Sequence, residues 1–179
     1  MKAGLIPLVL VTGVLIAAGV LVAFTIGADD SGGGDTSSLE GYFQALNTAQ
    51  TDIRAEYAAV ETQFPEAFSD KQQTVDYLDT SAEAWASGAT TLEGIDAPAE
   101  TADAHGTLVV ATGDVSQAFT DLGVGVQDIE DEEAALQEFV NSADTTAFDA
   151  YAEACTALQV IADDNAVTDD TGAAIVLVC

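Results

Sequence analysis

The sequence has very few positive charges. Its 179 residues include three Lys or Arg residues against 31 Asp or Glu residues, which gives a formal net charge of −28 at pH 7. A nucleic-acid binder needs a basic face to neutralise phosphates, and this chain cannot form one. The composition therefore excludes DNA and RNA as partners and favours weak, diffuse binding of cations by an acidic surface.

Cysteine and histidine are also scarce. Two Cys exclude a disulfide-dense scaffold, and the single histidine, His105, excludes any site that needs two imidazoles. We find no nucleophile elbow, di-iron Glu-x-x-His pair or haem-attachment motif. We therefore expect no enzyme activity, catalytic residue, metal or cofactor. His105 falls on an apolar helical stripe, which is typical of a core-edge side chain that makes one hydrogen bond.

Two acidic segments, residues 128–133 and 163–170, could offer oxygen ligands to calcium. Neither has the alternating Asp or Asn ligands, the turn Gly and the terminal Glu of an EF-hand loop, so we predict no specific calcium site. The excess of carboxylates resembles the surface of proteins adapted to high salt. It also suits an exported protein that must stay soluble.

One long hydrophobic run lies near the start of the chain. Residues 3–28 are 26 consecutive residues without a charge, and a helix of that length rises about 39 Å, enough to span a bilayer core of about 30 Å. The run is longer than the apolar region of a cleaved signal peptide and lacks a good cleavage site before residue 29. We therefore predict that residues 1–28 are an uncleaved signal anchor; cleavage after Ala28 is the alternative.

Flanking charges set the expected orientation. Lys2 precedes the run and Asp29 and Asp30 follow it, so the N-terminus should stay in the cytoplasm and the bulk of the chain should be extracytoplasmic. This describes a single-pass protein of the cell membrane. Residues 29–37 should form a flexible, acidic Gly/Ser linker, and residues 38–179 one helical domain.

The domain has helical periodicity almost throughout. Apolar residues recur at steps of three and four in four long segments, around 38–64, 70–94, 98–122 and 144–165. Each amphipathic helix hides its apolar face only against another, so we predict an all-α fold, an antiparallel four-helix bundle that follows the N-terminal transmembrane helix. An additional short helix should span about 128–141, and residues 173–179 should form an extended tail along the bundle.

Local signals set the expected ends of these helices. Ser37 and Glu40 form a capping-box pattern before the first helix, and Asp70 is a suitable N-cap for the second. Gly94 is a suitable C′ residue, and Pro98 should lie in the first turn of the third helix. Gly123 and Gly125 should bend or break that helix before Leu136 and Val140 continue the apolar stripe.

Cys155 and Cys179 are the only thiols. The expected topology places both in an oxidising compartment, so we predict a disulfide between them that closes a loop of about 25 residues. Two buried thiols, or a bridge between two chains, are the alternatives.

Two stretches resemble a group of small anchored or exported bacterial helical proteins of uncharacterised function. They read LEGIDAPAETADAHGTL (residues 92–108) and CTALQVIADDNAV (from residue 155). In that group a Pro opens a helix, a His follows about two turns later, and a helix Cys has a partner near the chain end. Pro98, His105, Cys155 and Cys179 match this pattern. The resemblance implies an extracytoplasmic bundle and no activity.

We therefore expect a non-catalytic, membrane-anchored extracytoplasmic module with an interaction or structural role at the cell envelope. A pilin-like filament subunit is the first alternative, because Lys2-Ala3-Gly4 before an apolar helix could be a short leader. An envelope ligand sensor or enzyme that uses His105 is the second.

Overall fold

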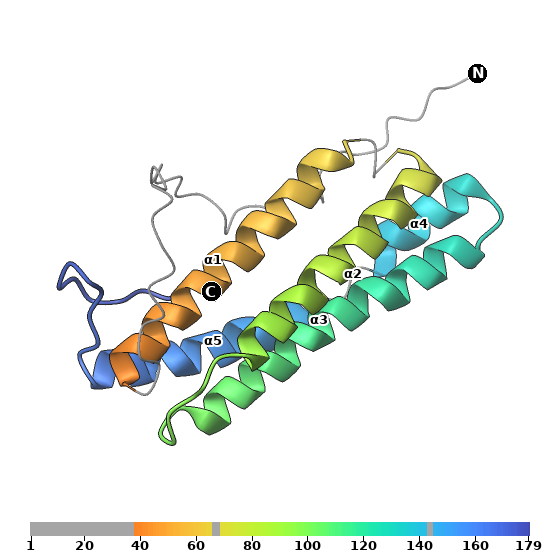
Figure 1. Ribbon diagram of the computed structural model, residues 1–179. Coiled ribbons are helices and arrows are strands. Elements are labelled where there is room, and N and C mark those ends of the chain that lie inside the picture. Colours follow the sequence, from red (N-terminus) through yellow and green to blue (C-terminus); the bar gives the residue numbers. More distant parts are fainter. Residues whose placement is uncertain (1–37, 66–68, 143–144) are drawn as a thin grey trace. The chain divides into compact units, whose positions relative to one another are not determined.

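The computed structural model describes residues 38–65, 69–142 and 145–179. The predicted anchor (residues 1–28) and linker (29–37) lie outside these residues. Within the described part, none of the helices has the length and apolar character needed to cross a membrane. The described residues form five α-helices, so the prediction of an all-helical bundle is confirmed (Figure 1). The helices are α1 (Leu39–Gln63), α2 (Lys71–Glu93), α3 (Ala102–Asp128), α4 (Glu132–Ser142) and α5 (Thr146–Asp164).

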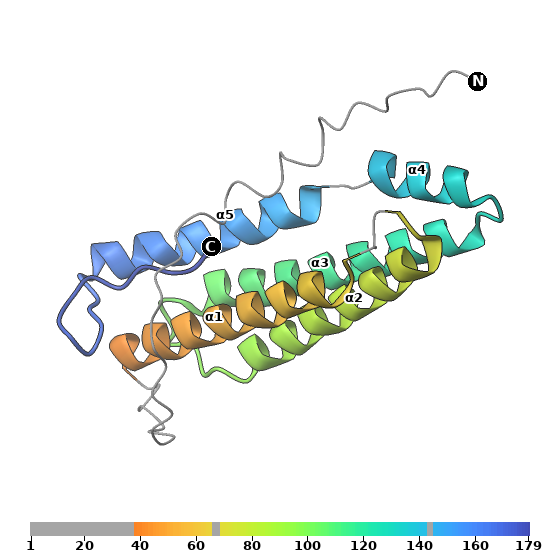
Figure 2. The same cartoon turned by 90° about the horizontal axis from the view of Figure 1, so that it is seen from above.

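The first three helices pack in chain order, and the last two both pack against α3. α1 lies against α2, α2 packs along the length of α3, and α3 contacts both α4 and α5. α4 and α5 follow one another along α3, α4 beside its C-terminal half and α5 beside its N-terminal half (Figure 2). Two aromatic residues mark this alignment: the rings of Phe119 in α3 and Phe148 in α5 are 5.8 Å apart.

The helix starts of α1 and α2 are capped by side chains. Ser38 accepts a hydrogen bond from the Gly41 amide at 3.0 Å, and Asp70 accepts one from the Gln73 amide at 2.8 Å. These bonds satisfy amides of the first turn that have no partner within the helix. The prediction for Asp70 is confirmed. The cap of α1 is Ser38, whereas the predicted Ser37 lies outside the described residues.

The third helix differs from its prediction at its start and near its end. It begins at Ala102, four residues after Pro98, so Pro98 precedes the helix and does not lie in its first turn. Pro98 belongs to a turn in which its carbonyl accepts a hydrogen bond from the Thr101 amide at 2.9 Å. The expected break at Gly123 and Gly125 is absent, because α3 continues to Asp128. A Cβ at Gly123 would lie 3.3 Å from Asp79 Oδ1 and 3.5 Å from Leu78 Cβ, so α3 passes close to α2 here.

Three other expectations about helix ends and faces were wrong. Gly94 ends α2 with φ −74°, a right-handed conformation, so α2 does not end in the left-handed glycine motif. α4 begins at Glu132, later than the predicted residue 128, and it buries Ala135 and Phe139. The predicted stripe used Leu136 and Val140, and Val140 is exposed.

The core has two parts, one at each end of the bundle. The larger part joins α1, α2, α3 and α5 with the C-terminal segment, and the smaller part joins the C-terminal half of α3 with α4 and the adjoining ends of α1 and α2. Phe119 packs against both parts. Its ring also lies within 6.4 Å of the rings of Tyr57 and Tyr77. Tilted and edge-to-face aromatic contacts therefore connect the two ends of the bundle.

Candidate functional site

The predicted disulfide between Cys155 and Cys179 is present, with the two Cα atoms 5.6 Å apart. It joins two very different environments. Cys155 lies in α5 and is fully buried in the larger core, whereas Cys179 is exposed. The disulfide therefore ties an exposed end of the chain to a sulfur inside the core.

A buried side chain from α1 lies against this disulfide. Gln50 is 1% exposed, and its Nε2 donates a hydrogen bond to Cys155 Sγ at 3.1 Å. A disulfide sulfur carries no proton, so only the N–H side of the amide can face it. Gln50 lies on the buried face of α1 among apolar residues, and no sequence pattern pointed to its partner.

Residues 165–179 are here named the C-terminal strap. They include the predicted extended tail, residues 173–179, which packs on the bundle as expected. Val167, Ile175 and Leu177 are buried in the larger core. The strap folds back on itself, because the Ile175 amide donates to the Val167 carbonyl at 3.1 Å. Figure 2 shows it beside α5, with the chain end between α5 and α1.

One side chain of α5 pairs with the strap backbone as a neighbouring β-strand would. Gln159 Nε2 donates to the Ile175 carbonyl at 3.1 Å, and its Oε1 accepts the Leu177 amide at 2.7 Å. These bonds fix the register that turns both apolar side chains inward.

The strap also bonds to the start of α1. Gln44 Nε2 donates to Asp170 at 2.9 Å, and Thr168 donates to Glu40 at 3.1 Å. Asp169 orders the loop between these contacts by accepting from the Thr171 and Ala173 amides and from the Thr171 hydroxyl. These hydrogen bonds lower the pKa of the Asp169 carboxyl, the Thr171 side chain contributing most.

His105 is buried where α1, α3 and the end of α2 meet. Its Nδ1 lies 3.0 Å from the hydroxyl of Tyr42. Burial lowers the pKa of the imidazole, and a hydrogen bond to the Leu92 backbone opposes this. Burial likewise raises the pKa of the Tyr42 phenol to about 12, and the Thr101 hydroxyl opposes that change. The prediction of a core histidine is confirmed, with a second partner in the Leu92 backbone.

A second hydroxyl pair joins α1 to α2. The hydroxyls of Tyr57 and Tyr77 are 2.8 Å apart, and burial raises the pKa of both phenols. The Trp85 indole packs edge-on against Tyr151, with ring centres 5.3 Å apart. These aromatic residues fill the centre of the bundle.

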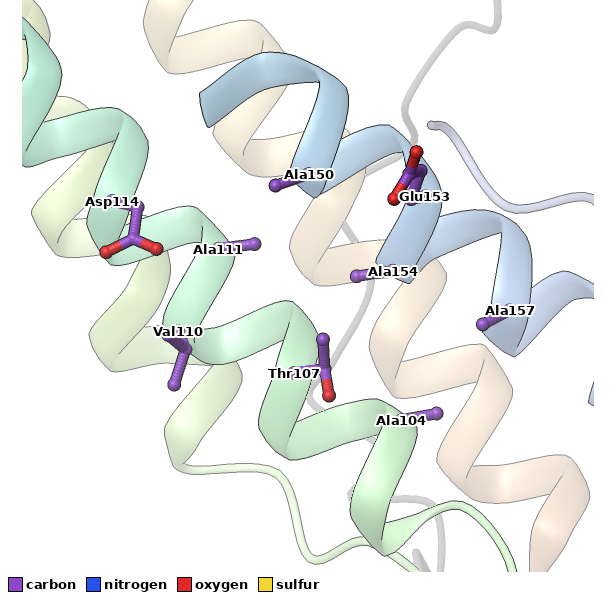
Figure 3. A pocket seen from close by; sticks show the side chains of 9 residues that line it. All are labelled: Ala104, Thr107, Val110, Ala111, Asp114, Ala150, Glu153, Ala154 and Ala157. Carbon is purple, nitrogen blue, oxygen red and sulfur yellow. The ribbon is translucent and has the colours of Figure 1, made fainter. Parts of the chain in front are cut away.

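The outer faces of α3 and α5 border a shallow groove of about 330 Å³ (Figure 3). Alanine side chains from both helices give it a small, apolar floor, and Val110 beside them is 63% exposed. Two carboxylates, Asp114 from α3 and Glu153 from α5, also line it, and no cationic side chain does. The remaining lining residues are Ala104, Thr107, Ala111, Ala150, Ala154 and Ala157. A smaller set, Asp149, Ala152, Glu153 and Thr156, borders a second open depression on α5.

The acidic segments considered from the sequence show mainly local roles. Asp131 accepts the Ala134 amide at 2.8 Å at the start of α4, where its charge complements the helix dipole. Among the described residues, no group of three or more His, Cys, Asp or Glu side chains has a metal-binding arrangement.

Sequence reasoning missed the groove and the Gln159 pairing. The groove depends on how α3 and α5 are placed relative to each other, which local sequence patterns do not show. Gln159 pairs with residues 16 and 18 positions later along the chain, beyond the range of helical periodicity. Comparisons with protein-family models, curated proteins and solved structures found no match to this chain.

Proposed function

We propose that this chain is an exported, membrane-anchored helical module that acts at the cell envelope by contact with a partner and not by catalysis. The Cys155–Cys179 disulfide carries the proposal, because structural disulfides persist in oxidising compartments outside the cytoplasm. The apolar run of residues 3–28 supplies the anchor, with the N-terminus in the cytoplasm.

The burial of the polar aromatic groups supports a contact role. His105 and Tyr42 bond to each other inside the core, and Tyr57 bonds to Tyr77. These groups therefore serve to hold helices together. The bundle offers a partner mainly carboxylates, hydroxyls and small apolar side chains.

The α3–α5 groove is the contact surface that we propose. Its alanine floor can accept the ridge of another helix at close distance. Asp114 and Glu153 favour a partner helix with Lys or Arg beside its apolar ridge. A second copy of this chain is a poor occupant, because each copy carries a formal charge of −28.

The location is tested by mass spectrometry of the mature protein purified from cell membranes, combined with protease treatment of intact cells. An intact N-terminus and digestion from outside support the anchored module. Processing after Gly4 would instead support the pilin-like filament subunit, and processing after Ala28 would release the domain from the membrane. Protection from external protease in cells without an outer barrier would contradict the proposal.

The groove is tested with a photo-crosslinking amino acid at Thr107, an exposed lining residue, in living cells. A single crosslinked partner should disappear in the Asp114→Asn/Glu153→Gln variant. The control variant Asp52→Asn/Glu61→Gln removes two exposed carboxylates of α1, which changes the net charge by the same amount. It should keep the crosslink. Equal loss in both variants would show that total charge, and not the groove, attracts the partner.

A further inference from the structure

The disulfide joins a buried residue to an exposed one. Cys179 is exposed, whereas Cys155 is fully buried among residues of α1, α3 and α5. A thiolate breaks a disulfide by attacking one sulfur and expelling the other, so access decides which sulfur is attacked. An external thiolate that approaches from the exposed residue attacks Cys179 Sγ and expels the Cys155 sulfur.

A thiolate that forms at Cys155 would be costly in an apolar core. Gln50 offsets this cost, because its Nε2 already donates to Cys155 Sγ at 3.1 Å from a position that is itself 1% exposed. A hydrogen bond to a charged acceptor is stronger than one to a neutral acceptor. The Gln50 bond should therefore strengthen as the S–S bond breaks.

We propose that the Cys155–Cys179 disulfide is a thiol-exchange site, which a reducing dithiol opens through Cys179 while Gln50 stabilises the departing Cys155 sulfur. The first thiolate of the dithiol bonds to Cys179 Sγ, the S–S bond breaks, and its electron pair stays on Cys155 Sγ. The second thiolate of the dithiol then attacks the dithiol sulfur that is bonded to Cys179. The mixed disulfide breaks, which releases the Cys179 thiolate and leaves the dithiol oxidised to a disulfide. Two electrons reach the protein, and two protons from solvent complete its thiols.

Opening the disulfide changes what holds the strap. The covalent bond at residue 179 is lost, and the last contacts of the strap become the Gln159 hydrogen bonds and the burial of Ile175 and Leu177. The end of the strap should then exchange its amide hydrogens faster, beginning at Leu177.

The attacked sulfur is identified with the full-length chain in detergent, treated with reduced glutathione as the thiol. Acid quenching, alkylation with iodoacetamide and peptide mass spectrometry then locate each adduct. We expect glutathione on Cys179 and the alkyl group on Cys155. Comparable amounts of glutathione on Cys155, or no mixed disulfide until a denaturant is added, would overturn the proposal.

The role of Gln50 is tested by the rate at which dithiothreitol opens the disulfide. Gln50→Leu removes the donor and should slow the opening about tenfold. Gln72→Leu is the matched control, because Gln72 is exposed on α2 and bonds to Asp76 of its own helix; its rate should equal that of the unmodified chain. An unchanged rate in a folded Gln50→Leu variant would show that Gln50 does not stabilise the departing sulfur. If that variant does not fold, the glutathione mapping still tests the attack at Cys179, because it uses the unmodified chain.

Discussion

Ile53 of α1 lies directly against the backbone of Gly88 in α2. A Cβ atom placed at residue 88 would be 2.6 Å from Ile53 Cγ1, closer than real contacts allow. Gly88 therefore lets the two helices approach closely here, although glycine within a helix costs about 0.5–1 kcal/mol relative to alanine.

Gly88→Ala should destabilise the fold by about 1 kcal/mol, because the overpacking cost exceeds the gain in helix propensity. Gly113→Ala is the matched control, since residue 113 has open space around its Cβ position and should gain stability. Urea unfolding followed by circular dichroism measures both. In an Ile53→Ala background the Gly88→Ala change should become stabilising; a cost that persists there would place the clash elsewhere.

The prediction of helices from the sequence succeeded where one side chain or one face decides the structure. The stripe through Leu46, Ile53 and Val60 is buried in α1, and Asp70 caps α2. Apolar periodicity and capping act over three or four residues, so they are visible in the sequence.

The errors arose where a neighbouring helix decides the outcome. Glycine at residues 123 and 125 was expected to bend or break α3, but the helix, which packs along α2, continues through both to Asp128. The disulfide was predictable from two cysteines. The Gln50 contact with Cys155 was not, because it joins residues 105 positions apart.

His105 gives the fold a dependence on pH whose direction follows from its lowered pKa. The unfolded chain binds a proton near the ordinary pKa of 6.5, while the folded chain resists protonation until a lower pH. The contribution of this group to stability is therefore unaffected above pH 6.5 and is lost as the pH falls below it.

The variant His105→Gln removes this proton linkage and keeps a side chain that can bond to the Tyr42 hydroxyl. Between pH 7.5 and pH 5 its melting temperature should fall less steeply than that of the unmodified chain. Carboxylates contribute equally to both profiles, so the difference between them isolates the imidazole. Parallel profiles would show that His105 is protonated as easily in the folded chain as in the unfolded one.

The disulfide should contribute strongly to stability. It closes a loop over a sequence separation of 24 residues, and the chain-entropy model assigns such a loop about 3 kcal/mol. Cys179→Ser should lower the melting temperature without changing the helix content, because the bond lies outside the hydrogen bonds of the helices. Two free thiols in denatured, unreduced protein from cells would contradict the bond itself.

Salt should stabilise this fold well beyond ordinary ionic strength. Helix faces crowded with carboxylates repel one another, and the compact chain feels this repulsion more than the unfolded chain does. The few cations reduce this repulsion only slightly. Lys71, for example, donates to the Gln127 carbonyl at 3.1 Å, where its charge stabilises the negative C-terminal end of α3.

Raising the salt concentration shortens the Debye length from about 10 Å at 0.1 M to about 3 Å at 1 M. Most repulsion between neighbouring carboxylates should then vanish, so the melting temperature should rise with NaCl well past 0.1 M. CaCl₂ should match or modestly exceed this rise without a defined stoichiometry, because diffuse screening needs no particular ligands. A melting temperature that stays flat up to about 1 M NaCl would mean that the charges are too dispersed to matter. A saturable step at micromolar calcium would instead reveal a specific site, and isothermal titration calorimetry would then give its stoichiometry.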